Sequence, residues 1–379
     1  MKPSLLEILA CPKCLGDLEL NVKTFKEDEI VDGNMWCPRC DMIFLIKDGV
    51  SIFGIKRENA TERYREIEAE NRWVYDANKL QVHIDYAIES SKYLENLIPK
   101  LKKRIRSKSI ENKKLRVLDL GAGWGAFQSW QFSKYGFEVI ALELCPEFMF
   151  ATDYVLQNGD VFFERTMADC TLLPFRNGTF DVIFCKEIVH HVKNLDSLFN
   201  EISRIASSSS IIVVLEPCNK IFPNLSLSKS RDLAAEVGLT HQHYTYLDYI
   251  GQMKKIAMDI ERDEKIVSVD PSKRPMLSIL LKSMERILNW MARKERLRIL
   301  QKTVRSMAVI LAGGELELIG TARPDRDEYV LINRDIIPIN LDNLRLNEQK
   351  LNYYRCQLIP EVFKVFSAAY GERDIKHKP

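Results

Sequence analysis

Four cysteines near the N-terminus have the spacing of metal ligands. They form two Cys-x-x-Cys pairs, Cys11 with Cys14 and Cys37 with Cys40. Two such pairs can surround one zinc ion as a tetrahedral site, and four thiolates leave no open position for water or substrate. We therefore predict a structural zinc. Reduced cysteines without metal and a redox pair are the alternatives, whereas a disulfide framework fits poorly because the chain has nine cysteines.

A second chemically distinctive stretch, Leu115–Phe127, joins an apolar run to a glycine-rich turn. Gly121, Gly123 and Gly125 follow Val117–Leu120 at intervals of two residues. This pattern is typical of a strand that turns tightly and presents its backbone to a nucleotide-like ligand. The relaxed dinucleotide fingerprint is also satisfied here, and an ordinary tight turn is the remaining alternative.

Acidic residues distinguish between these ligands. Asp119, two residues before the first glycine, would repel a diphosphate but attract a cationic group. S-adenosylmethionine carries a sulfonium and an ammonium group and no phosphate, so Asp119 favours it. Glu143 follows Gly123 by twenty positions, where a doubly wound sheet places the carboxylate that binds the ribose hydroxyls. A surface acid at a strand end is the alternative for Glu143.

A third acidic residue is expected where the next strand ends. Asp169 would accept a hydrogen bond from the exocyclic amine of adenine, and Cys170 beside it belongs to the same predicted cofactor site. Asn177–Gly178 predicts a turn before a short buried strand at Val182–Phe184. Three strand ends would thus each contribute one acid to the cofactor site.

An ordered set of these residues closely resembles the class I S-adenosylmethionine-dependent methyltransferases: Asp119, Gly121, Gly123, Gly125, Glu143, Asp169 and the run from Phe180 to Ile183. Leu173–Phe175 and Glu187–Val192 resemble the subgroup that acts on small molecules, lipids and sugars. The resemblance covers residues 115–220. It implies an α/β fold with a doubly wound, Rossmann-like sheet, and it implies that Asp119 lies near the amino-acid part of the cofactor, above the glycines.

Methyl transfer is a direct displacement, so the protein mainly positions the acceptor and excludes water. A hydroxyl acceptor also benefits from a base. His190 and His191, just beyond the fourth strand of the expected sheet, are the candidate catalytic residues, and Glu187 is a weaker one. For each histidine a structural role is the alternative.

The N-terminal segment resembles a second family. Leu5–Cys14, Trp36–Cys40 and Phe44–Ile52 are similar to small zinc ribbons whose members activate methyltransferases as separate subunits. Ser51 stands where that family carries a proline. The resemblance covers residues 1–56, a segment too small to bury a sufficient core without a metal.

The whole chain divides into five predicted segments: 1–56, the zinc ribbon; 57–114, a helical lead-in covering the cofactor cleft; 115–220, the S-adenosylmethionine-binding core; 221–312, a helical insertion that covers the substrate or forms a dimer contact; and 313–379, the last sheet strand and a C-terminal tail. Within the insertion, His241 and His243 either reach an acceptor or cap a helix. The amphipathic helices expected over 276–311 favour core or dimer packing, with a membrane surface as the alternative.

Composition gives little indication of a partner. The chain has 55 basic and 53 acidic residues and a net charge of +2. Its basic stretch between Lys100 and Arg116 either binds along the phosphates of a nucleic acid or is a solvated helix end and linker. Without a signal-peptide pattern or a membrane-spanning apolar run, we expect the cytoplasm.

The residues together favour an enzyme acting on a small hydroxylated acceptor, such as a sugar or secondary metabolite. RNA methylation is a less favoured alternative, because the net charge of +2 offers little general attraction for a polyanion. A non-catalytic scaffold is the other alternative. A homodimer is an arrangement that the amphipathic helices allow.

Overall fold

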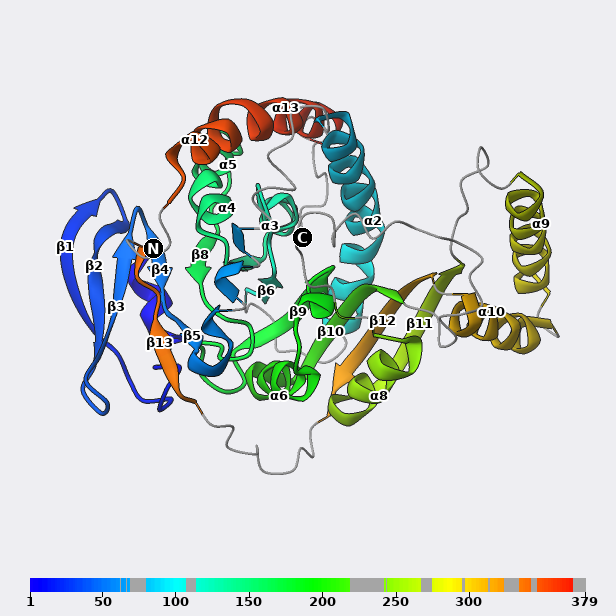
Figure 1. The fold of residues 1–379 in the computed structure, drawn as a ribbon, viewed down its shortest axis with the longest axis horizontal. Helices are drawn as coiled ribbons and strands as arrows, with labels where there is room; N and C mark the ends of the chain where they lie inside the picture. Colours follow the sequence, from blue (N-terminus) through cyan, green and yellow to red (C-terminus); the bar gives the residue numbers. More distant parts are fainter. Residues whose placement is uncertain are drawn as a thin grey trace.

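The computed structural model describes residues 1–61, 63–65, 67–68, 80–106, 114–218, 242, 244–266, 275–294, 297–312, 314–323, 334–341 and 346–370. Within them, one large sheet runs through the molecule with helices on both faces (Figure 1). Its strands are β1 (Glu19–Lys26), β2 (Glu29–Cys37), β3 (Met42–Lys47), β4 (Val50–Ile52), β6 (Arg116–Leu120), β7 (Glu138–Glu143), β8 (Glu164–Met167), β9 (Phe180–Lys186), β10 (Ala206–Cys218), β11 (Ala257–Ile266) and β12 (Gly314–Ala322).

The strand order confirms the predicted doubly wound α/β fold. The sheet runs β1-β2-β3-β4-β8-β7-β6-β9-β10-β12-β11. Strands β8, β7, β6, β9 and β10 are parallel, whereas β12 is antiparallel to both β10 and β11. Val117–Leu120 is buried throughout, as expected for a parallel strand covered on both faces. The order in which strands are added to the sheet reverses between β6 and β9, so the connections after these two strands diverge at the carboxyl edge.

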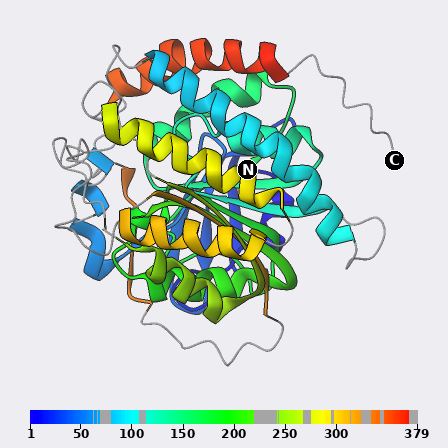
Figure 2. The same cartoon turned by 90° about the vertical axis from the view of Figure 1, so that its right-hand side faces the viewer.

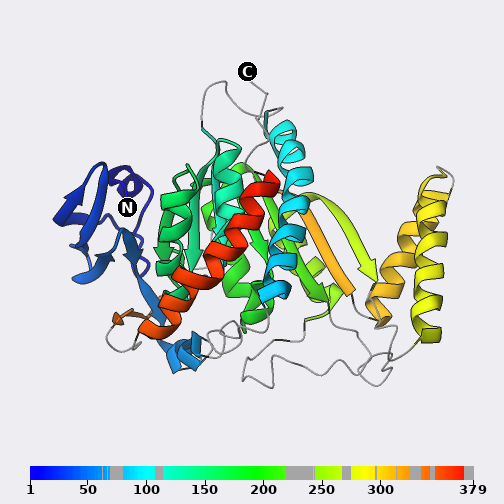
Figure 3. The same ribbon diagram turned by 90° about the horizontal axis from the view of Figure 1, so that it is seen from above.

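Helices cover the two faces of this sheet, and Figure 3 looks from above onto one of these faces. The helical elements are η1 (Pro3–Glu7), η2 (Arg57–Asn59), α2 (Leu80–Arg106), α3 (Phe127–Lys134), α4 (Pro146–Ala151), α5 (Asp153–Asn158), η4 (Val189–His191), α6 (Leu195–Ile205), α8 (Tyr246–Ile256), α9 (Pro275–Ala292), α10 (Arg298–Ala312), α12 (Glu348–Tyr353), the π-helix η6 (Tyr354–Leu358) and α13 (Ile359–Tyr370). Alternate residues of β6 face opposite cores: Val117 packs with α2, α3 and α13, and Leu118 packs with α6 and α8.

The zinc-ribbon segment continues the same sheet. Its strand β4 pairs in parallel with β8, where Ser51 lies opposite Thr166 and the two hydroxyl oxygens are 3.0 Å apart. On the other side, the Ala10 N–H donates to the Pro174 carbonyl at 2.9 Å. The ribbon is therefore held both by a strand pairing and by contact with the loop after β8. Ser51, which departs from the ribbon family's proline, supplies one of these contacts.

The lead-in forms the long helix α2, as its apolar spacing predicts. Leu94, Leu97, Ile98, Leu101 and Ile105 are buried along one side. The aromatic residues Trp73 and Tyr75, and the histidines His241 and His243, lie outside the described residues.

One segment differs from its expectation, and another has structure for which no prediction was made. Residues 221–312 were expected to be helical, but their described part also contains strand β11. This strand borders the sheet and is rich in charged residues, with Asp259 and the run from Glu261 to Lys265, which suits an edge that must resist further pairing. The C-terminal tail is also structured: β13 (Ile336–Pro338) pairs with β5 (Gly54–Lys56), and α13 packs on α2.

Within the described residues, no helix has the length and apolar character needed to cross a membrane.

Helix α13 contributes to the core that supports the glycine-rich turn. Phe366 is 1% exposed, and its ring lies 5.2 Å from Phe127 and 5.1 Å from Trp130. We predict that Phe366→Ala lowers the free energy of unfolding by about 3–5 kcal/mol, because it leaves a cavity among aromatic rings. Val365→Ala is the matched control, since Val365 is 39% exposed. Equal urea midpoints for the two variants would contradict this assignment.

Candidate cofactor and metal sites

The carboxyl ends of three neighbouring strands gather the predicted cofactor-binding acids. Asp119 near the end of β6 pairs with Ala141 of β7, and Glu143 at the end of β7 pairs with Met167 of β8. Asp169 follows β8 by two residues. The structure therefore brings all three side chains to the same edge of the sheet, and the glycine-rich turn begins between β6 and α3 at that edge.

The glycine-rich turn has a backbone that other residues adopt poorly. Gly121 and Gly123 have φ angles of +79° and +67°, in the left-handed region that favours glycine. A Cβ at Gly121 would lie 2.8 Å from Ile188, whereas a Cβ at Gly123 would meet no atom within 4 Å. The turn is thus packed tightly on one side and open above Gly123, as a backbone that approaches a ligand must be.

Asp119 lies at the base of this turn. Its side chain is buried, and the Ser129 hydroxyl donates to Oδ2 at 2.6 Å. The pKa of Asp119 is raised to about 7, chiefly by burial and also by the charge of Glu143, with the hydrogen bond from Ser129 acting against the rise. A cationic ligand beside Asp119 would favour its ionised form.

Glu143 holds the turn in place through its carboxylate. Oε2 accepts a hydrogen bond from the Gly123 N–H at 2.9 Å, and Oε1 accepts from the Leu144 and Cys145 N–H groups at 2.7 and 2.9 Å. Burial raises the pKa of Glu143, and these three donors act against the rise. The residue predicted to bind ribose is therefore also a brace for the glycine-rich turn.

Asp169 is buried at the third strand end. Its Oδ1 accepts from the N–H and hydroxyl of Thr171 at 2.9 and 2.8 Å. Its Oδ2 accepts a hydrogen bond from the backbone N–H of Lys56 at 3.4 Å and lies 3.9 Å from Arg63 Nε. Cys170, also predicted for this site, is 7% exposed. Sequence reasoning missed Lys56 and Arg63, because only the folded path from the ribbon to α2 brings them here.

Of the two candidate catalytic histidines, His190 has a carboxylate partner. Its Nδ1 lies 2.6 Å from Glu216 Oε2, near the end of β10. Glu216 Oε1 also accepts from the N–H groups of Ile188 and Val189 at 2.8 Å each. The ring of His191 lies against that of His190, tilted by 37°, with ring centres 4.3 Å apart. Glu216 was not predicted as a site residue, although its place at a strand end was a usable signal.

A polar cluster from α2 and β9 lies beside this edge. Lys186 Nζ lies 3.9 Å from the centre of the Tyr86 ring and donates to the Tyr86 hydroxyl and to Glu187 Oε1. The Tyr86 hydroxyl lies 3.1 Å from Glu187 Oε2. Burial raises the pKa of Tyr86, so its hydroxyl stays protonated. Tyr86 and Lys186 carried no sequence motif, and only tertiary packing brings them together.

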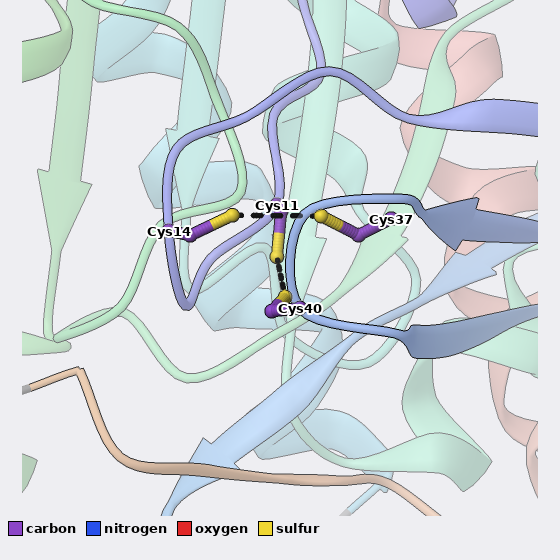
Figure 4. Close-up of side chains that lie close together, drawn as sticks. All are labelled: Cys11, Cys14, Cys37 and Cys40. Carbon is purple, nitrogen blue, oxygen red and sulfur yellow. Dashed lines mark hydrogen bonds between the residues drawn. The ribbon is translucent and has the colours of Figure 1, made fainter.

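The four N-terminal cysteines converge as predicted (Figure 4). All four Sγ atoms lie within 4.8 Å of one another, with Cys11 and Cys40 at 3.4 Å and Cys14 and Cys37 at 3.5 Å. Thiolates bound to one tetrahedral zinc at about 2.3 Å lie roughly 3.8 Å apart, so the cluster fits that ion. Burial raises the pKa of Cys40 to about 11, and a bound cation would provide the charge that thiolates need.

Two family models match the chain. Residues 118–214 match the model described as "Methyltransferase domain", and residues 2–49 match the model described as "Trm112p-like protein". Both resemblances inferred from the sequence are thereby confirmed over these ranges. The methyltransferase match spans the glycine-rich turn and all three acids, and the Trm112p-like match spans the four cysteines.

Curated relatives match only part of the chain. An uncharacterised protein of Methanocaldococcus jannaschii is 33% identical over 109 residues, which are 28% of this chain and 44% of the relative. Phosphoethanolamine N-methyltransferase 1 of Zea mays is 27% identical over 104 residues, 27% of this chain and 21% of the relative. This chain therefore covers less than half the length of either relative.

Solved structures show a similar partial likeness. Haemonchus contortus phosphoethanolamine N-methyltransferase 2 in complex with S-adenosyl-L-methionine has a TM-score of 0.39 and 18% identity, covering 60% of this chain and 53% of that one. The YcgJ protein of Bacillus subtilis has a TM-score of 0.39 and 18% identity, covering 60% of this chain and 98% of that one.

The cysteine cluster predicts one zinc per chain. Cys11→Ser should remove the zinc and lower the thermal stability of the ribbon, because the ion supplies folding energy that the small segment lacks. Cys356→Ser is the matched control, since Cys356 is exposed and remote in sequence from the cluster. Elemental analysis of protein purified without chelators measures the zinc content per chain. A wild-type chain without metal, or equal zinc in both variants, would refute the site.

Proposed function

We propose that this chain, which combines a methyltransferase domain with a Trm112p-like zinc ribbon, is an S-adenosylmethionine-dependent methyltransferase acting on a small hydroxylated acceptor such as a sugar or secondary metabolite. Its ribbon carries a structural zinc, and its site of action is the cytoplasm. The five predicted segments are retained as its domains, with residues 115–220 as the cofactor-binding core and with β11, from within residues 221–312, as part of the sheet.

The observation that carries this proposal is the gathering of three acids at the sheet edge where the open glycine-rich turn begins. Asp119, Glu143 and Asp169 end neighbouring parallel strands, and the space above Gly123 is open. In the proposed complex, Asp119 attracts the cationic amino-acid end, Glu143 accepts from the ribose hydroxyls, and Asp169 accepts from the adenine amine, with Cys170 beside it. A scaffold protein would not need this set of acids.

Bound S-adenosylmethionine would supply an electrophilic methyl group on its sulfonium. This chain's residues then position the acceptor and take up its proton. Because Glu216 engages Nδ1 of His190, Nε2 is the nitrogen of that ring which can accept a proton, and the buried carboxylate stabilises the imidazolium that results. The acceptor oxygen gains a carbon bond and loses its proton to His190. His191 packs on the His190 ring and helps to hold it.

The basic stretch of α2 supports a small acceptor over RNA. The Lys102 ammonium donates to the Tyr135 carbonyl, and Arg104 donates to Glu261 and to the Asp259 carbonyl at 3.1 and 3.0 Å. Arg116 likewise pairs with Glu138 at 3.1 Å. Cations engaged in these internal contacts are less available to neutralise phosphates.

The first test of the proposal is the affinity for S-adenosylmethionine. Glu143→Ala should weaken binding by about 1–3 kcal/mol, because ligand hydroxyls lose a charged acceptor and the Gly123 N–H loses its brace. Glu138→Ala, at the opposite end of β7, should bind as the wild type does. Titration calorimetry measures both. An unchanged affinity of the Glu143 variant would show that this residue is not part of the site. If the wild type did not bind S-adenosylmethionine, the proposed methyltransferase activity would be refuted.

The raised pKa of Asp119 predicts how affinity depends on pH. Below about 7 the ligand-free carboxyl is protonated, and S-adenosylmethionine must displace that proton to gain the charge attraction. Affinity should therefore rise between pH 5.5 and 7.5, and Asp119→Asn should bind weakly with a flat profile.

The same shift has an opposite effect on the stability of the ligand-free protein. A carboxyl whose folded pKa lies above its unfolded value stabilises at low pH, and this contribution is lost as the pH rises through about 7. Glu164 also has a pKa raised by burial to about 7. The difference in stability between the wild type and Asp119→Asn therefore isolates the contribution of Asp119.

The affinity measurements decide the role of Asp119 in binding. Parallel profiles of affinity against pH in calorimetry for the wild type and Asp119→Asn would contradict that role.

A further inference from the structure

The helices α9 and α10 form a hairpin at the end of the molecule opposite the zinc ribbon (Figure 1). Figure 2 looks at this end and shows both helices in front of the sheet. Leu288 of α9 and Val309 of α10 are buried, at 1% and 0% exposure, and pack in the core that contains α8. An ion pair between Arg305 and Glu285 at 3.3 Å joins the two helices.

The other side of the hairpin presents large apolar side chains to solvent. On α9, Ile279, Ile287 and Trp290 are 62%, 58% and 55% exposed, and spacings of eight and three residues place them on one face. On α10 the exposed residues are Ile299, Leu300, Val304 and Met307, at 82%, 53%, 37% and 56%. A monomeric protein seldom exposes so many apolar side chains within one short segment without a binding role.

Cations surround this apolar face. The described part of residues 275–312 has six exposed basic side chains: Lys282, Arg286, Arg293, Lys294, Arg298 and Lys302. Its acidic residue is Glu285, which is paired with Arg305. Arg286 of α9 lies four residues before Trp290, and Arg293 lies three residues after it in the turn that follows the helix, so both arginines flank the apolar face. The hairpin is thus strongly basic in a chain whose net charge is only +2.

We propose that the α9–α10 hairpin binds the surface of an anionic lipid bilayer. Aliphatic and Trp side chains enter the boundary between headgroups and acyl chains, while lysine and arginine side chains pair with lipid phosphates. The charge decides against a second copy of this chain as the occupant, because a two-fold interface would oppose six cations to six. RNA would engage the cations but would leave Ile279, Ile287 and Ile299 without a role.

Vesicle sedimentation tests this proposal independently of the methyltransferase activity. The full chain should sediment with vesicles of equal phosphatidylcholine and phosphatidylglycerol, bind pure phosphatidylcholine vesicles about tenfold more weakly, and lose affinity as salt rises. The paired variant Ile287→Ser with Trp290→Ser and the paired variant Arg286→Glu with Arg293→Glu should each weaken binding by about tenfold or more. Both pairs are exposed, so neither change should disturb folding.

Matched controls exclude a general charge effect. Lys100→Glu with Lys103→Glu changes the charge equally on exposed positions of α2 and should bind anionic vesicles as the wild type does. Absence of binding to anionic vesicles, or equal binding by all variants, would overturn the proposal. So would a dimer in light scattering that Trp290→Ser converts to a monomer, or RNA binding that the arginine variant abolishes while the apolar variant sediments unchanged.

Discussion

The carboxyl edge of the parallel sheet holds several carboxylates where water has little access. The structure of the site depends on how the cost of burying these charges is offset. Asp119, Glu143, Asp169 and Glu216 all lie at strand ends there, and the side chains of Asp119, Asp169 and Glu216 are buried. Desolvation opposes the ionised form of a carboxyl, so such an arrangement lasts only when donors or cations compensate for it.

The protein provides part of this compensation with backbone N–H groups. Three of them reach Glu143, and two reach Oε1 of Glu216. Asp119 has the hydroxyl and the backbone N–H of Ser129, and its pKa is nevertheless raised to about 7. It is therefore the acid with most to gain from a cationic ligand, which is the physical reason to place the positively charged part of S-adenosylmethionine beside it.

The residues of the cofactor and metal sites were easier to predict from the sequence than the residues that pack around them. Asp119 and the three glycines lie in one continuous stretch, so strand and turn alone define their relation, and the cysteine pairs define their cluster in the same way. Tyr86 and Lys186 meet only through the packing of α2 on the sheet, and Arg63 reaches Asp169 only through the path of the chain before α2. No local pattern specifies either arrangement. Strand β11 was missed because an edge strand rich in charged residues has weak periodicity, whereas the apolar spacing of Phe363 and Phe366 in α13 was an available signal.

The central claim is that this chain methylates a small hydroxylated molecule. The most direct measurement incubates the purified protein with S-adenosylmethionine labelled on its methyl group and a cell extract, then separates small molecules, RNA and protein. The account predicts label in the small-molecule fraction, with transfer greatly reduced by Asp119→Asn. Label confined to RNA or protein, or no transfer by the wild type to any fraction, would contradict it.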